Sequence, residues 1–298
     1  MTVTARGPFT DPGAAHERPN GPVLPLGRRV SLNGRGSTFI REVAGPPGAP
    51  TLLLLHGWVA SGGMNWYQAF EPLSRHFRII APDMRGHARG LRTRKIFRLA
   101  DCADDAAETL SQLDTGPVIA VGYSMGGPIS QLLWRRHRDL VSGLVLVATA
   151  PGFLPVSRQR LAYQSWMLGV AAAARAASFA PSLPNFVGGT PRVLPAWVAA
   201  EMRRHDWRMV VEAGHSIGTF YSGKWIREID VPTAVVCTTQ DRAVQPSLQR
   251  ALADAIPGAR LHEIPDGHLA CSRPGFAQPL VRACDEVADR INRSTSRR

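Results

Sequence analysis

The residues best placed to do chemistry lie in one short glycine-rich segment, Gly122-Tyr-Ser124-Met-Gly126. The apolar run 118–121 before it predicts a buried strand. After it, apolar residues recur at helical spacing with arginines on the other side, which predicts an amphipathic helix. A Gly-x-Ser-x-Gly turn between strand and helix is typical of a nucleophile elbow, where strained backbone exposes a serine hydroxyl. Glycines are needed there because side chains at those positions would clash with the neighbouring strand and helix. The sequence therefore predicts Ser124 as a nucleophile.

A serine hydroxyl needs a base to remove its proton, and the base needs an acid to orient it. His268 comes just after a strand expected at 259–264, and Asp241 just after a strand expected at 233–238. In an open α/β sheet, functional groups gather at the carboxyl ends of the strands. The chain order Ser124, Asp241, His268 fits a catalytic triad with His268 as the base and Asp241 as the acid.

Other ionisable residues compete for these roles. Asp266 precedes His268 by two residues, in a Pro-Asp-Gly turn where its carboxylate is expected to bond the local backbone. His56 and His87 are expected in loops near the same edge, with structural hydrogen bonds. His262 is interpreted as a residue within a strand, and Asp104 and Asp105 are interpreted as solvated charges on a helix.

The elements that must position these residues alternate between strand and helix. Strands are expected at 28–32, 38–43, 51–55, 78–81, 118–121, 143–148, 233–238 and 259–264. Helices are expected around 66–76, at 101–114 with Asp101 as N-cap, after the elbow, and near 246–256 and 275–292. Continuous apolar strands are typical of a parallel sheet covered on both faces. The fold class is therefore α/β, with a doubly wound and mostly parallel sheet.

The alternation breaks after Ala150, where residues 151–228 lack a buried strand and show helical stretches near 157–178 and 192–213. This predicts a helical cap inserted into a core made of residues 26–150 and 229–292. Residues 1–25 and 293–298 are expected to be loose tails. Within the cap, four residues are candidates for substrate binding: Trp166, Met167, Phe179 and His215.

Composition narrows the possible partners and setting. The net charge of +12 comes almost wholly from arginine, but no basic stripe with interleaved aromatics accompanies it, which argues against nucleic-acid binding. The excess charge can still attract anionic surfaces or substrates. The four cysteines form no CxxC motif or His/Cys cluster, which predicts no metal site and a reducing, cytoplasmic setting. Neither a secretory signal nor a membrane span is expected, because long apolar runs are missing.

Over about residues 28–292 the chain resembles the α/β-hydrolase superfamily, because it carries five of the family's motifs in the family's order. These are His56-Gly57-Trp58, Asp83-Met-Arg85-Gly86-His87, the Gly-Tyr-Ser-Met-Gly-Gly elbow, Gln240-Asp241-Arg242 and Asp266-Gly267-His268. One departure is Ala88, which stands where the family pattern Asp-x-Arg-Gly-x-Gly has its last glycine. The resemblance implies a helical cap inserted after the sixth core strand. The Ser-Met-Gly-Gly elbow with a His-Gly-Trp turn looks like the esterase, lipase and cofactor-free perhydrolase branches. A serine at 124 argues against dehalogenases and epoxide hydrolases, which need an aspartate nucleophile. The expected oxyanion hole consists of the backbone amides of Trp58 and Met125.

The sequence therefore predicts a capped serine esterase that cleaves a carboxylic ester, with an apolar acyl substrate, through an acyl-enzyme. No cofactor or metal is expected, and the expected partner is a small-molecule ester or related acyl compound. Thioesterase, carbon–carbon bond hydrolase, perhydrolase and acyltransferase activities stay open on the same fold. A hydrolase-like binding protein without catalysis is the alternative from another class, and the oligomeric state is open.

Overall fold

The protein is built on one eight-stranded sheet, in the order β1-β2-β4-β3-β5-β6-β7-β8. The computed structural model describes residues 21–153 and 195–296. The strands are β1 (Gly27–Leu32), β2 (Gly36–Val43), β3 (Thr51–Leu55), β4 (Arg78–Pro82), β5 (Val118–Tyr123), β6 (Val141–Val147), β7 (Thr233–Thr238) and β8 (Arg260–Ile264). β2 pairs antiparallel with both β1 and β4, and all other neighbours pair in parallel. The predicted α/β fold with a mostly parallel sheet is confirmed.

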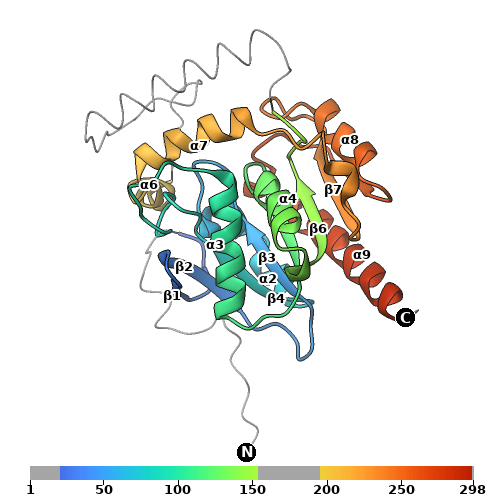
Figure 1. Cartoon of the computed structure of the whole chain (residues 1–298), viewed down its shortest axis with the longest axis horizontal. Coiled ribbons are helices and arrows are strands. Elements are labelled where there is room, and N and C mark those ends of the chain that lie inside the picture. The colour runs from blue at the N-terminus through green and yellow to red at the C-terminus, as the bar shows by residue number, and fades with distance from the viewer. Residues whose placement is uncertain (1–20, 154–194, 297–298) are drawn as a thin grey trace, which may run out of the picture.

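Helices cover both faces of this sheet (Figure 1). One layer contains α3 (Leu99–Gln112), α4 (Gly126–Arg136) and α8 (Pro246–Ala255), and the other contains α1 (Gly62–Trp66), α2 (Phe70–Ser74) and α9 (Ala277–Thr295). Successive residues of the central strands alternate between the layers, so Leu53 belongs to the core that includes residues of α3 and α4, whereas Leu54 belongs to the core that includes residues of α9. Both side chains are fully buried. Continuous apolar strands are therefore required because each residue faces one of two cores.

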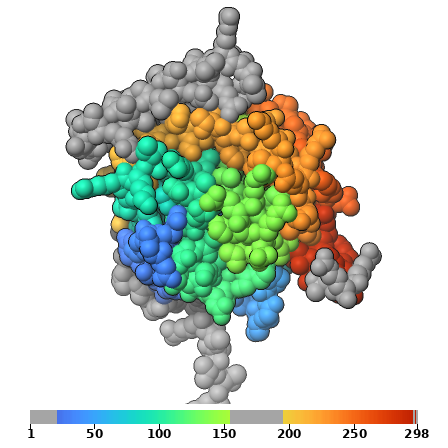
Figure 2. Space-filling view, in the orientation of Figure 1, coloured from blue at the N-terminus to red at the C-terminus, as the bar shows by residue number. Residues whose placement is uncertain are grey.

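Residues 195–230 contain α6 (Ala196–Met202) and α7 (Trp207–Thr219). α7 crosses the end of the sheet at which the parallel strands terminate (Figure 1). In the space-filling view, the yellow and orange surface of this segment borders the green and teal surface of α3 and α4 (Figure 2). The expected helix at 192–213 is two helices, because Asp206 caps α7 by accepting from the Met209 amide. The cap boundaries stay a prediction, and the helix expected near 157–178 lies outside the described residues.

Short 3₁₀ helices complete the described chain: η2 (Arg138–Leu140), η3 (Ile226–Glu228), η4 (Ala270–Ser272) and η5 (Pro274–Phe276). In residues 21–153 and 195–296, no helix is both long and apolar enough to cross a membrane. The four cysteines are all buried and unpaired.

Three further local predictions were wrong. The helix expected around 66–76 is two short helices, which place Trp66 and Phe70 in the same core. Asp101 does not cap α3, which begins at Leu99; it lies in the first turn, where a carboxylate is favourable, and pairs with Arg85 at 3.1 Å. Asp105 is not a solvated charge: its carboxylate is buried between Arg35 and Arg85, at 2.6 and 2.7 Å.

Candidate active site

The backbone at Ser124 has the form that the sequence predicted. The chain leaves β5, passes through Ser124 with φ of +50°, and enters α4. This is the left-handed region, which costs a non-glycine residue energy and is held only by surrounding contacts. A Cβ on Gly122 would lie 2.3 Å from the carbonyl oxygen of Gly126, and a Cβ on Gly126 would lie 2.0 Å from that of Leu55. Both glycines are therefore needed for the strand, the turn and α4 to approach so closely.

The three predicted side chains lie in one hydrogen-bonded row. Ser124 Oγ is 2.9 Å from His268 Nε2, and His268 Nδ1 is 2.8 Å from Asp241 Oδ2. Ser124 follows β5, Asp241 follows β7, and His268 follows β8, so the row runs along the carboxyl ends of parallel strands. The Asp241 side chain is fully buried, whereas a quarter of the His268 side chain is exposed. Solvent therefore reaches the imidazole of His268 but not the carboxylate of Asp241.

Asp241 is held as a carboxylate by its surroundings. Its Oδ1 accepts from the amides of Ala243 and Val244 at 2.8 and 2.9 Å. Its Oδ2 accepts from Thr238 Oγ1 at 2.8 Å beside the imidazole. Burial alone would raise the pKa of Asp241, but the hydrogen bonds from His268, Val244 and Thr238 outweigh it, so its pKa lies below the ordinary value. An ionised Asp241 favours the proton on Nδ1 of His268, which leaves Nε2 free to accept the serine proton.

Asp266 has a different environment. Its Oδ1 accepts from the amide of Gly267 at 2.8 Å, within the turn that leads to His268. The carboxylate that faces the imidazole is Asp241, 27 residues earlier in the chain.

Several residues that support the row were missed by the sequence reasoning. Tyr123 donates to the carbonyl of His268 at 2.7 Å, and Thr149 donates to the carbonyl of Ser124 at 2.9 Å. Gln249 in α8 bonds Thr238, Val244 and Asp241 together. Thr238 could have been predicted as a partner of Asp241, because its hydroxyl stands at the last position of β7, three residues before Asp241. Gln249 has no comparable pattern, because its role depends on how α8 packs.

The loop that carries Trp58, whose amide is expected to form part of an oxyanion hole, is held by His56. His56 Nδ1 donates to the carbonyl of Gly57 at 2.8 Å, and its Nε2 accepts from the amide of Met84 at 2.9 Å. Burial lowers the pKa of His56 to about 4, so the ring is neutral, as these two bonds require. The C=O and N–H of a trans peptide point in opposite directions, so His56 also fixes the direction of the Trp58 amide.

The loop that carries Trp58 lies against Ser124, and Met125 directly follows Ser124 in the chain. A Cβ on Gly57 would lie 3.4 Å from the Cβ of Ser124, which places the loop before Trp58 against the serine. Met125 is the N-cap of α4, where backbone N–H groups are free of helical partners and the helix end favours negative charge. The side chain of Trp58 is used separately, since its Nε1 donates to the carbonyl of Val210 in α7 at 2.7 Å.

The candidate substrate-binding residues are described only in part. Trp166, Met167 and Phe179 lie outside the described residues. His215 lies in α7, and its Nδ1 is buried with no hydrogen-bond partner in the described part of the chain. In that same part, no group of three or more His, Cys, Asp or Glu side chains is arranged to hold a metal ion.

A set of polar contacts, here called the polar seam, ties the α6–α7 segment to the loops after β3 and β4. Ser61 Oγ lies 3.1 Å from Glu201 Oε2, and the amide of Ala88 donates to His205 Nδ1 at 2.7 Å. The remaining members are the bonds from the Phe97 amide to Glu212, from the Leu99 amide to Ser216, and from Trp58 to Val210. The imidazoles of His56, His87 and His205 stack edge to face beside the seam, with ring centroids 5.3 and 5.5 Å apart.

Comparison with known proteins agrees with this fold. Residues 50–272 match the family model described as the alpha/beta hydrolase fold, and the chain belongs to this family.

Relatives within the family carry different names. The chain is 29% identical over 255 residues to the magnesium-chelatase 30 kDa subunit of Rhodobacter capsulatus, covering 76% of this chain and 82% of that protein. It is 28% identical over 257 residues to the poly(3-hydroxyalkanoate) depolymerase of Ectopseudomonas oleovorans, covering 79% and 85%. A shorter match, 34% over 111 residues, joins 37% of the chain to 41% of the pimeloyl-[acyl-carrier protein] methyl ester esterase of Vibrio vulnificus.

Solved structures show the same fold. The thermophilic esterase of Thermogutta terrifontis superposes with a TM-score of 0.69 at 24% identity, covering 89% of this chain and 99% of that one. The enol-lactonase of Burkholderia xenovorans superposes with a TM-score of 0.67 at 23% identity, covering 88% and 100%. At these identities the likeness concerns the fold alone.

Proposed function

We propose that the protein is a serine hydrolase that cleaves a carboxylic ester through an acyl-enzyme. The observation that carries the proposal is the hydrogen-bonded row from Ser124 through His268 to Asp241, at 2.9 and 2.8 Å. These distances suit proton transfer between a nucleophile, a base and an orienting acid.

In this mechanism His268 Nε2 takes the Ser124 proton as the serine oxygen attacks the ester carbonyl. The negative oxygen of the tetrahedral intermediate is stabilised by the amides of Trp58 and Met125. The imidazolium, stabilised by Asp241, then gives its proton to the departing alcohol, which leaves an acyl group on Ser124. Water repeats the sequence, with His268 as base and then acid, and releases the carboxylic acid.

The proposed substrate class is an ester with an apolar acyl part. Two of the relatives are named for esters, the pimeloyl methyl ester esterase and the polyhydroxyalkanoate depolymerase. The apolar residues Trp166, Met167 and Phe179 of the proposed cap support the same preference, since each buried CH₂ contributes about 0.8 kcal/mol. A panel of nitrophenyl esters from acetate upward, with matched acyl thioesters, tests this. Rising kcat/KM with acyl length is expected, and a flat profile contradicts the apolar site. Preference for the thioesters would assign the thioesterase alternative.

Labelling with a fluorophosphonate tests the nucleophile. We expect Ser124→Ala to lose the label and to lose kcat by a factor on the order of 10⁶, with its circular dichroism unchanged. Ser272→Ala is the matched control, because Ser272 is an exposed serine four residues after His268 and should keep both label and activity. Undiminished labelling and turnover in Ser124→Ala would show that another serine is the nucleophile.

We also propose a reducing, cytoplasmic setting for the protein. The four buried and unpaired cysteines support it, because oxidising compartments favour disulfides.

A further inference from the structure

Residues 92–98, here called the basic loop, lie between the turn after β4 and the start of α3. Their sequence is Arg-Thr-Arg-Lys-Ile-Phe-Arg, so four of the seven side chains are cationic. Ile96 directly follows Arg94 and Lys95, all three residues are exposed, and the exposed fraction of Ile96 is 57%. The basic loop therefore presents positive charge and an apolar side chain to water at the same place.

Both ends of the basic loop are fixed to α7. The carbonyl of Thr93 accepts from Arg208 at 2.6 Å, and the amide of Phe97 donates to Glu212 at 2.8 Å. The Phe97 side chain is buried in the core that includes residues of α3. A teal projection, in the colour of this part of the chain, stands out beside the yellow surface of the α6–α7 segment (Figure 2). The anchored ends thus leave residues 94–96 as an exposed tip.

The exposed cations of the basic loop have no acidic partner within the described part of the chain. There, the side chains of Arg94, Lys95 and Arg98 make no ion pair and no hydrogen bond. The carboxylate at the base of the loop serves another cation, because Glu212 pairs with Arg208 at 3.0 Å. Negative charge that neutralises these three side chains therefore has to come from a partner.

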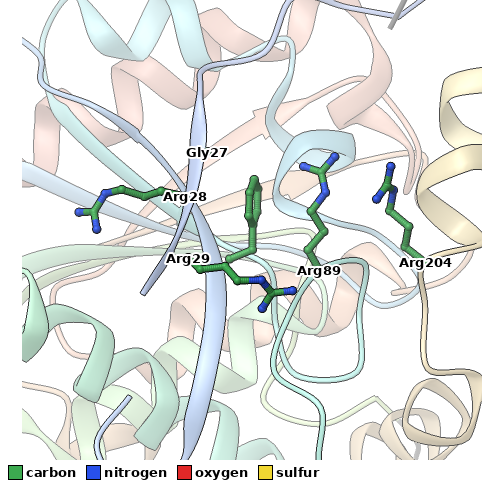
Figure 3. A pocket seen from close by; sticks show the side chains of 6 residues that line it. Gly27, Arg28, Arg29, Arg89 and Arg204 are labelled. Atoms are coloured by element: carbon green, nitrogen blue, oxygen red, sulfur yellow. The ribbon is translucent and has the colours of Figure 1, made fainter. Parts of the chain in front are cut away.

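Another group of arginines is placed differently. These arginines line an open pocket at β1 (Figure 3): Arg28, Arg29, Arg89 and Arg204. In that pocket Arg28 pairs with Glu42 at 3.0 Å, and Arg204 lies 3.5 Å from Glu201. Carboxylates of the protein itself thus contact the arginines of the pocket, which distinguishes it from the tip of the basic loop.

We propose that the basic loop docks the protein on the surface of a membrane that contains anionic phospholipids. Phosphate headgroups spread over a plane can meet several cations at once without a fixed geometry. Ile96 enters the boundary between headgroups and acyl chains, where removal of its side chain from water is favourable. A nucleic acid fits less well, because single strands stack on exposed aromatic side chains and Phe97 is buried. This surface is independent of the reaction proposed for Ser124.

Sedimentation with phosphatidylcholine vesicles that contain phosphatidylglycerol tests the proposal on the full chain. At about 0.1 M salt, where the Debye length is about 10 Å, we expect binding that saturates with lipid. Vesicles of phosphatidylcholine alone should not support it. Arg94→Gln and Lys95→Gln should each weaken partitioning about fivefold, because a cation close to an anionic surface contributes on that order.

Arg293→Gln is the matched control. Arg293 is an exposed arginine in the last turn of α9, which ends on the opposite side of the molecule from α6 (Figure 1). The variant loses the same charge as Arg94→Gln, but it should change partitioning by less than about twofold. A dependence on net charge alone would instead affect both variants equally.

Ile96→Ser separates docking on lipid from simple attraction of charges. This variant keeps every cation, yet it should weaken partitioning at least about threefold, because the apolar side chain no longer leaves water. The factor should persist when added salt screens the cations. Circular dichroism and the urea midpoint should match the wild type in all variants, because the substituted side chains are exposed.

Four results would overturn the proposal. Three concern the vesicles: binding that does not depend on phosphatidylglycerol, equal losses in Arg94→Gln and Arg293→Gln, or partitioning of Ile96→Ser equal to that of the wild type. The fourth is a loss of binding to a DNA oligonucleotide in Arg94→Gln and Lys95→Gln that exceeds their loss on vesicles, which would assign the basic loop to nucleic acid.

Discussion

The carboxyl ends of the parallel strands, here called the sheet edge, and the polar seam both bury polar side chains. The two regions position these side chains in different ways. At the sheet edge, Ser124, Asp241 and His268 each follow a strand whose pairing fixes the backbone. At the polar seam, side chains such as Glu201 and His205 reach from the α6–α7 segment to loop atoms after β3 and β4. Strand pairing therefore positions the residues at the sheet edge, whereas bonds between individual side chains and loop atoms hold the polar seam together.

If the proposed mechanism holds, this difference should separate catalysis from stability. A change in the row of Ser124, His268 and Asp241 should then remove a reacting group while both apolar layers keep the fold. A change in the polar seam leaves the row of Ser124, His268 and Asp241 intact but exposes or orphans a buried partner, which affects stability first. The following predictions test this separation, from the largest expected effect to the smallest.

After the loss of Ser124 itself, the largest effect is expected at Asp241. Asp241→Asn should lower kcat by a factor on the order of 10³–10⁴, because an amide beside Nδ1 favours the wrong imidazole tautomer, as in another serine hydrolase triad. Asp266→Asn is the control and should lose less than about tenfold, since its carboxylate bonds the Gly267 amide. Ester hydrolysis by the wild type and both variants is measured at one and the same pH. The reverse ranking would assign the orienting role to Asp266, and small effects in both would point to a third carboxylate.

A smaller effect is expected at His56, which joins the two regions through the loop that holds Trp58. His56→Ala frees the Gly57–Trp58 peptide and should lower kcat by about 10- to 100-fold, less than the loss of an oxyanion donor itself. KM should change little, because the donor acts on the transition state. His262→Ala serves as control, since His262 pairs with Glu286 in another part of the sheet. A rise in KM at unchanged kcat would show that His56 serves substrate binding instead.

The contrast also explains what the sequence could and could not predict. The neighbouring positions of Ser124, Asp241 and His268 could be predicted because each follows a strand, apolar and buried before Ser124 and Asp241, and strand ends of a parallel sheet converge. The pairing of Glu201 with Ser61 spans 140 residues and depends on how α6 docks, which no periodic pattern encodes. Asp105 was misjudged for the same reason: its burial depends on Arg35 and Arg85, which lie 70 and 20 residues earlier.

The polar seam should also make stability depend on pH. Burial lowers the pKa of His56 and of His205 to about 4, and that of His87 well below its ordinary value. Between pH 6.5 and 4 the unfolded chain binds protons that the folded chain does not. Each histidine therefore lowers the free energy of unfolding by up to about 1.4 kcal/mol per pH unit as the pH falls. Asp83, whose pKa burial raises to about 6, acts in the opposite direction and offsets part of this loss.

His205→Gln tests that dependence, because glutamine keeps an acceptor for the Ala88 amide but does not titrate. The loss of unfolding free energy between pH 7 and pH 5 should be about 2 kcal/mol smaller in the variant than in the wild type. Urea denaturation at the two pH values measures both losses. Equal losses of unfolding free energy in the variant and the wild type would mean that His205 is not held neutral in the fold. The polar seam would then not be a source of pH-dependent stability.

The smallest effect is expected at Ala88, where the sequence departs from the family pattern. Ala88 has φ of +41° and is buried at 1% exposure, so it carries the strain that a glycine would avoid. Relief of that strain is worth about 1–2 kcal/mol. It is opposed by about 0.4–1 kcal/mol of unfolded-state entropy and by the lost burial of one methyl group, about 0.8 kcal/mol. Ala88→Gly should therefore change the free energy of unfolding by less than about 1 kcal/mol.

Ala88→Val provides the contrast at the same position. A β-branched residue at positive φ is strongly disfavoured, so this variant should be clearly less stable than Ala88→Gly in the same urea titration. If glycine stabilised the chain by more than about 2 kcal/mol, alanine would be a strained choice kept for another purpose. A near-neutral glycine and a destabilising valine would instead show that the backbone at position 88 accepts a single methyl group but not a branched side chain.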